Sequence, residues 1–83
     1  MVNRINCVCQ DFDEIGEFYS ILEFERFQRY IEELVNGGSL VEVQVQKRFA
    51  GFPEQWYHCK DCMQTWRLVH PDFPFKGIWE RVK

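Results

Sequence analysis

The pattern of hydrophobic and polar residues predicts one helix in the first half of the chain. Hydrophobic side chains recur at helical spacing after Ser20, and we expect an amphipathic helix over residues 21–35. Its buried stripe would consist of Leu22, Phe24, Phe27, Ile31, Leu34 and Val35. Ser20 and Glu23 match a capping box, which satisfies backbone N–H groups of the first turn. Asn36-Gly37-Gly38 is typical of a helix end.

Alternation with a period of two predicts short strands on both sides of this helix. Residues 2–10 would form a first strand with Ile5, Cys7 and Cys9 on one face. Later strands are expected over residues 40–49, 55–59, 64–70 and 78–82, the first of them with Val41, Val43, Val45 and Phe49 on its half-buried side. Residues 11–19 fit either a short helix or a loop pinned by its aromatic side chains.

This order of elements predicts an α+β domain, with one helix on a largely antiparallel sheet of about five strands. Residues 55–59 and 64–70 would form a hairpin with Cys59-Lys60-Asp61-Cys62 at its tip. The 83 residues show no repeat and no linker, so we expect a single domain over 1–83. A domain of this size buries only about 60% of the surface that its unfolded chain exposes. A bound metal or a partner would therefore add materially to its stability.

Composition favours a folded protein outside the membrane. Hydrophobic residues make up 46% of the chain, which is enough for a core and argues against disorder. No apolar run approaches the roughly 20 residues of a membrane span, and the first residues lack the apolar segment of a signal peptide. We expect a cytoplasmic location, where cysteines are free or bound to metal more often than paired in disulfides.

The Cys59-x-x-Cys62 pair indicates a zinc knuckle, in which turn amides support two thiolates on one ion. Cys7 and Cys9 supply two further thiols, so the sequence predicts a structural Zn²⁺ bound by Cys7, Cys9, Cys59 and Cys62. Met63 stands where knuckles commonly carry glycine. A strained local disulfide and simple packing of small apolar side chains are the alternatives. The spare candidate ligands are His58 and His70.

Catalysis is not expected from these residues. A redox C-x-x-C motif places its first thiol at a helix N-terminus, whereas Cys59 follows a predicted strand and another strand comes next. Ser20 and Ser39 are explained as a helix cap and a turn after the helix, and no glycine-rich phosphate loop is present. We therefore expect a protein that is not an enzyme.

Charge is unevenly distributed around a net value of −3, and the acidic residues concentrate before and within the predicted helix. This segment would attract a basic protein surface and repel nucleic acid, although a solvated helix face is the simpler explanation. The candidate contacts are Asp11, Asp13, Glu14, Glu17, Glu25 and Glu32. Aromatic residues crowd the second half of the chain, either as a second small core or as exposed anchors such as Trp56 and Tyr57. Nucleic-acid binding would need a basic face from Lys47, Arg48, Lys60, Arg67, Lys76 and Arg81.

The run from Trp56 to Val69, continued by residues 71–77 and Trp79, resembles small bacterial immunity proteins encoded beside polymorphic or contact-dependent inhibition toxins. The C-x-x-C-x-x-x-W part is also similar to the second half of zinc ribbons. The first resemblance implies a non-enzymatic domain that neutralises one cognate toxin, often a nuclease with a basic cleft. The second implies, as the alternative, a zinc-ribbon-like module that binds nucleic acid or an assembly. The oligomeric state stays open.

Overall fold

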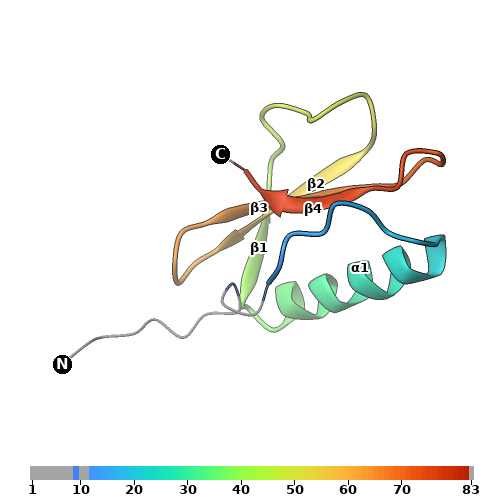
Figure 1. Ribbon diagram of the computed structural model, residues 1–83. Coiled ribbons are helices and arrows are strands. Elements are labelled where there is room, and N and C mark those ends of the chain that lie inside the picture. The colour runs from blue at the N-terminus through green and yellow to red at the C-terminus, as the bar shows by residue number, and fades with distance from the viewer. Residues whose placement is uncertain (1–8, 10–11, 83) are drawn as a thin grey trace.

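The computed structural model describes residues 9 and 12–82, which form one helix and a four-stranded antiparallel sheet (Figure 1). The elements are α1 (Ile21–Asn36), β1 (Leu40–Val43), β2 (Glu54–Cys59), β3 (Thr65–Val69) and β4 (Ile78–Arg81). Each strand pairs with the next in sequence, in the order β1-β2-β3-β4. The α+β class is confirmed, with four strands in the described residues instead of about five. The strand expected over residues 2–10 lies outside them except for Cys9.

The ends of α1 follow the predicted capping chemistry. The hydroxyl of Ser20 accepts a hydrogen bond from the Glu23 N–H at 3.1 Å, and the Glu23 carboxylate accepts one from the Tyr19 N–H at 2.9 Å. Gly38 adopts a left-handed conformation (φ 87°) just after the helix. The predicted Ser20 cap and the predicted stop are confirmed, whereas the Glu23 carboxylate accepts from Tyr19, the residue before the N-cap, and not from the first turn. Among the described residues, no helix combines the length and the apolar content that a bilayer crossing requires.

The predicted burial is wrong for one residue of the apolar stripe on α1. Phe24 and Ile31 are buried, whereas Leu22 is 54% exposed. Two positions along a helix correspond to a rotation of about 200°, so Leu22 and Phe24 cannot both face the sheet. Leu22 therefore adds an apolar side chain to the surface near the start of α1.

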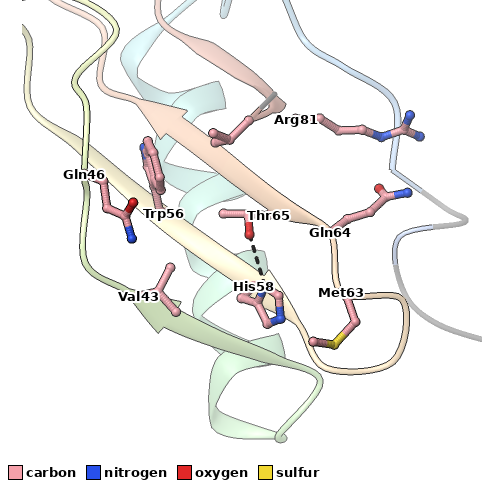
Figure 2. A pocket seen from close by; sticks show the side chains of 9 residues that line it. Val43, Gln46, Trp56, His58, Met63, Gln64, Thr65 and Arg81 are labelled. Carbon is pink, nitrogen blue, oxygen red and sulfur yellow. Dashed lines mark hydrogen bonds between the residues drawn. The ribbon is translucent and has the colours of Figure 1, made fainter.

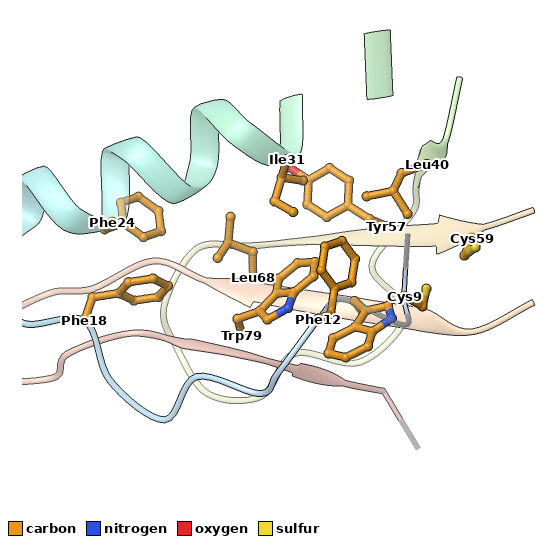
Figure 3. Packing of buried hydrophobic residues seen from close by; sticks show 11 residues of the cluster. Cys9, Phe12, Phe18, Phe24, Ile31, Leu40, Tyr57, Cys59, Leu68 and Trp79 are labelled. Carbon is orange, nitrogen blue, oxygen red and sulfur yellow. The ribbon is translucent and has the colours of Figure 1, made fainter. Parts of the chain in front are cut away.

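The register of the strands determines which side chains form the core under α1. The face that α1 covers carries Leu40, Tyr57, Cys59, Trp66, Leu68 and Trp79. Trp66 and Trp79 stack with ring centroids 5.1 Å apart, and Phe12 meets both rings edge-on at 5.2 Å. Figure 3 shows Cys9 and Cys59 at one end of this core and Phe18 and Phe24 at the other.

Residues 12–19 form the loop that was one of the two expectations for this segment. It runs beside β4, where Ile15 and Trp79 exchange two backbone hydrogen bonds of 2.8 Å (Figure 1). Phe12 and Phe18 are buried, so aromatic side chains anchor the loop at both ends. The segment is thereby held between β4 and α1.

The strand predicted over 40–49 is too long, because β1 ends at Val43. The chain then leaves the sheet on the side away from α1 (Figure 1). Phe49 donates its backbone N–H to the Glu54 carboxylate, and its ring lies 5.7 Å from the guanidinium of Arg67. These contacts explain why the loop folds over the open face of the sheet. The predicted inward side is wrong as well, since Leu40 is buried and Val41 is exposed.

Candidate metal centre and acidic surface

Three thiols converge at one end of the core. The sulfur atoms of Cys9, Cys59 and Cys62 all lie within 4.8 Å of one another, and none is in a disulfide. Cys9 and Cys59 are buried, and Cys62 is partly buried. We refer to these three residues as the thiol triad. Cys7, the fourth predicted ligand, lies outside the described residues.

The turn between β2 and β3 presents backbone amides to the sulfur of Cys59. Burial alone would raise the pKa of this thiol, but hydrogen bonds from the backbone N–H groups of Cys62 and Asp61 help to lower it below its ordinary value. The turn is closed by the Met63 N–H on the Cys59 carbonyl at 2.9 Å and by the Cys59 N–H on the Gln64 carbonyl at 2.8 Å. This arrangement favours a thiolate, which is the form that binds metal.

Met63 takes the backbone conformation that glycine would supply at this position. Its φ is 66°, in the left-handed region that side chains disfavour, and its side chain is exposed. The absence of glycine after the second cysteine therefore does not prevent the knuckle-like turn. The turn instead retains a backbone conformation that disfavours any residue with a Cβ.

We expect Met63→Gly to keep metal binding and to raise the free energy of unfolding by up to about 1 kcal/mol, because glycine adopts positive φ without steric strain. Met63→Ala is the matched control, since it removes the same exposed side chain but retains the Cβ. Urea denaturation with Zn²⁺ present would compare the three proteins. An alanine variant as stable as the glycine variant would contradict a strained turn.

Cys9 reaches the site from a different part of the chain. Its carbonyl accepts a hydrogen bond from the Phe12 N–H at 3.2 Å, and the Phe12 ring is buried in the core. Burial and the nearby thiols of Cys62 and Cys59 raise the pKa of the Cys9 thiol, while the indole N–H of Trp66 acts in the opposite direction. Together these effects favour the neutral form of the Cys9 thiol.

The geometry of the triad is compatible with a tetrahedral thiolate site. Around Zn²⁺ with bonds of ~2.3 Å, sulfur atoms lie ~3.8 Å apart, so movements of about 1 Å or less would close the observed triad on an ion. The site is also largely shielded from water, as structural metal sites usually are. The structure thus brings together three of the four predicted ligands in an arrangement that can hold a metal ion.

The two spare histidines lie away from the triad. His58 points to the open face of the sheet, where its Nδ1 lies 3.0 Å from the Thr65 hydroxyl. His70 lies 3.1 Å from the Gln55 side-chain oxygen and packs on Phe24, and burial lowers its pKa. Neither residue therefore belongs to the thiol triad.

A shallow depression of about 650 Å³ lies on the open face, next to the turn that carries the cysteines (Figure 2). It is lined by Val43, Gln46, Trp56, His58, Met63, Gln64, Thr65, Arg81 and Val82. Within this depression the side chains of His58 and Thr65 are hydrogen-bonded to each other. No prediction from the sequence concerned this surface, which depends on where the chain leaves β1.

The two predicted aromatic anchors are not at the surface. Trp56 is 7% exposed and Tyr57 is 1% exposed, so neither ring can serve as a surface anchor. The Trp56 indole N–H donates to the Glu54 carboxylate at 2.6 Å. Burial, followed by the carboxylates of Glu42 and Glu32, raises the pKa of Tyr57. Strand alternation cannot reveal that both faces of β2 are covered, one by α1 and one by the loop after β1.

The predicted acidic contacts are exposed wherever the structure describes them. Asp13, Glu14, Glu17, Glu25 and Glu32 all have exposed side chains, and Asp11 lies outside the described residues. A hollow of about 430 Å³ opens between the 12–19 segment and the first turns of α1. Its lining consists of Glu14, Ile15, Gly16, Glu17, Phe18, Tyr19, Glu23 and Phe27, and we call it the acid-rimmed hollow.

The sequence predicted the residues of the thiol triad but not the tryptophan near them. Trp66 lies on the same face of the sheet as Cys59 and influences the Cys9 thiol. Trp66 follows Cys62 by four residues, and side chains an even number of positions apart lie on the same face of a strand. This spacing is the signal that could have identified Trp66. The apolar floor of the acid-rimmed hollow was also missed, because it joins side chains from two separate segments.

Comparison with known proteins identified no relative: no protein-family model, no curated protein and no solved structure matches this chain.

Proposed function

We propose that this chain is a non-enzymatic binding protein that neutralises a cognate bacterial toxin through a basic surface of that toxin, and that a structural Zn²⁺ stabilises it. The acid-rimmed hollow carries the proposal, because it combines carboxylates with an apolar floor in one concave site. A lysine or arginine side chain fits such a site, with its methylene groups on the partly exposed Ile15 and Phe27 and its charge at the rim.

The charges of this hollow are available to a partner. Within residues 9 and 12–82, the ion pairs are those of Arg67 with Glu54 and Glu80, each at 3.8 Å. The carboxylates of the hollow take part in none of them. Glu14 and Glu23 accept backbone hydrogen bonds, from Arg81 at 3.2 Å and from Tyr19 at 2.9 Å, and so keep fixed positions. Fixed, unpaired charges favour rapid and selective association with an oppositely charged surface.

Apolar side chains beside the hollow can add contact area. Tyr19 is 74% exposed, and Ile21 and Leu22 are exposed next to it. Exposed aromatic and aliphatic residues near charge are the usual anchors of protein interfaces. They replace Trp56 and Tyr57 in the proposed binding surface.

The metal in this proposal is Zn²⁺, with Cys7, Cys9, Cys59 and Cys62 as its four ligands. All-thiolate coordination suits Zn²⁺, and the burial of the triad suits a structural role. When bound, Zn²⁺ would supply folding energy and no reaction chemistry.

The alternative of a zinc-ribbon-like nucleic-acid module is less well supported by the placement of the basic residues. Arg67 lies between Glu54 and Glu80, and its side chain is largely buried. Arg81 stacks over Trp66 at 5.2 Å. These contacts interrupt the basic face that nucleic-acid binding would need.

The test is co-purification with the product of the adjacent open reading frame, together with protection of cells that express that product. We expect a stoichiometric complex and restored growth. A neighbouring product that neither binds the chain nor is neutralised by it would refute toxin neutralisation. Salt-sensitive binding of RNA or DNA without such a complex would instead favour the alternative.

A further inference from the structure

We infer that Trp66 positions Cys9 as a metal ligand, by donating a hydrogen bond from its indole N–H to the Cys9 sulfur when the metal is bound. This inference rests on the metal binding proposed above. It concerns a residue outside the predicted ligand set and assigns it a role in how tightly the site holds its ion.

The first observation is an unsatisfied donor. Trp66 is fully buried, and its Nε1 atom has no hydrogen-bond partner among the described residues. Buried N–H groups are rarely left unpaired, because they lose their bonds to water and gain nothing in return. An acceptor placed beside this N–H would therefore be favourable.

The second observation is the place of Trp66 beside the thiol triad. Trp66 pairs with Tyr57, two positions from Cys59 on the same face of the sheet. The Trp66 ring also meets that of Phe12, whose backbone N–H donates to the Cys9 carbonyl. A thiolate bound to a metal is a charged acceptor and forms stronger hydrogen bonds than a neutral thiol. A bound ion would thus give this donor a strong acceptor.

The third observation is that the donor cannot turn away. The Trp66 ring stacks on Trp79 at 5.1 Å, meets Phe12 edge-on at 5.2 Å, and is covered by the Arg81 guanidinium at 5.2 Å. A donor held in this way fixes the direction of its acceptor. Hydrogen bonds from the second shell orient metal ligands in the same manner and increase the affinity for the metal.

Trp79 provides a matched control within the same cluster. It is also fully buried, and its Nε1 also lacks a partner in the described part of the chain. It pairs with Leu68, two positions farther along β3 than Trp66, which places it away from the thiol triad. Substituting either tryptophan with phenylalanine removes one N–H and similar volume, but only Trp66 borders the thiol triad.

The experiment compares Zn²⁺ affinity in the wild type, Trp66→Phe and Trp79→Phe by competition with a chelating indicator under reducing conditions. We expect Trp66→Phe to weaken binding by about tenfold or more and Trp79→Phe to change it by much less. Equal losses in the two variants would overturn the inference and leave the metal centre in place. A wild-type protein that binds no Zn²⁺ would overturn both.

Proton NMR of the wild type gives a second measurement that survives if Trp66→Phe does not fold. In the Zn²⁺-bound protein, the indole N–H resonance of Trp66 should lie well downfield of that of Trp79, as a hydrogen bond to a thiolate requires. The chain has three tryptophans, so Trp79→Phe and Trp56→Phe together assign the three indole signals. A Trp66 resonance no farther downfield than that of Trp79 would overturn the inference.

Discussion

Cys59→Ser should abolish metal binding and leave the protein largely unfolded at room temperature. Cys59 is completely buried at the centre of the thiol triad, and serine cannot replace its thiolate as a ligand for a soft ion. Small domains have only about 3–5 kcal/mol of stability from their cores, and a structural Zn²⁺ contributes more than that. Metal analysis and circular dichroism of the purified variant would measure the two effects.

Two comparisons separate the loss of a ligand from the loss of packing. Val69 is also fully buried, on the opposite face of the sheet, so Val69→Ala should lower stability while retaining the bound ion. A chelator added to the wild type should reproduce the unfolding of Cys59→Ser. If the thiols only pack, Cys59→Ser would cost about 1–3 kcal/mol. A wild-type protein that is folded and free of metal would show that packing is their role.

Glu17→Lys should slow association with the toxin by about tenfold at low salt, with a much smaller effect at high salt. Glu17 lies on the rim of the acid-rimmed hollow, is exposed, and its carboxylate is outside the ion pairs of the described residues. Reversing its charge would repel the basic side chain that we propose to enter the hollow. Stopped-flow measurement at several salt concentrations, with the co-purified toxin, would test this.

Glu33→Lys is the control for the overall change in charge. Glu33 is exposed and lies near the C-terminal end of α1, whereas the acid-rimmed hollow adjoins the start of α1. At about 0.1 M salt, where the Debye length is about 10 Å, Glu33→Lys should reduce the rate only slightly, because Glu33 lies about 15 Å along α1 from Glu23 of the hollow. Equal effects of Glu17→Lys and Glu33→Lys would show that net charge, rather than the hollow, governs association.

The helix and the pairing of the later strands could be read from the sequence because local signals determine them. The Ser20 cap, the turn at Gly38 and the alternation of residues 64–70 each act over a few positions. The end of β1 could not be read in this way. It depends on Phe49 meeting Arg67 and Glu54, contacts that form only after the sheet has assembled.

The same distinction applies to the candidate site. The spacing of Cys59 and Cys62 identifies them as candidate ligands. Cys9 was predicted because it would share one face of a strand with Cys7. In the structure, Cys9 is hydrogen-bonded through its carbonyl to the backbone of the buried Phe12 and is in no described strand, so the right residue followed from an incomplete structural reason. Trp56 and Tyr57 were misplaced because composition shows that aromatic residues are abundant but not which of them the loop and α1 cover.

The thiol triad also encloses a length of chain. Cys9 and Cys59 are ~50 residues apart in sequence, and a metal bound to both would close a loop that contains α1, β1 and β2. If the ion also stays bound to both thiols in the unfolded chain, it lowers the conformational entropy of that chain by the equivalent of about 4 kcal/mol. The ion would then stabilise the fold even without one additional contact in the native state.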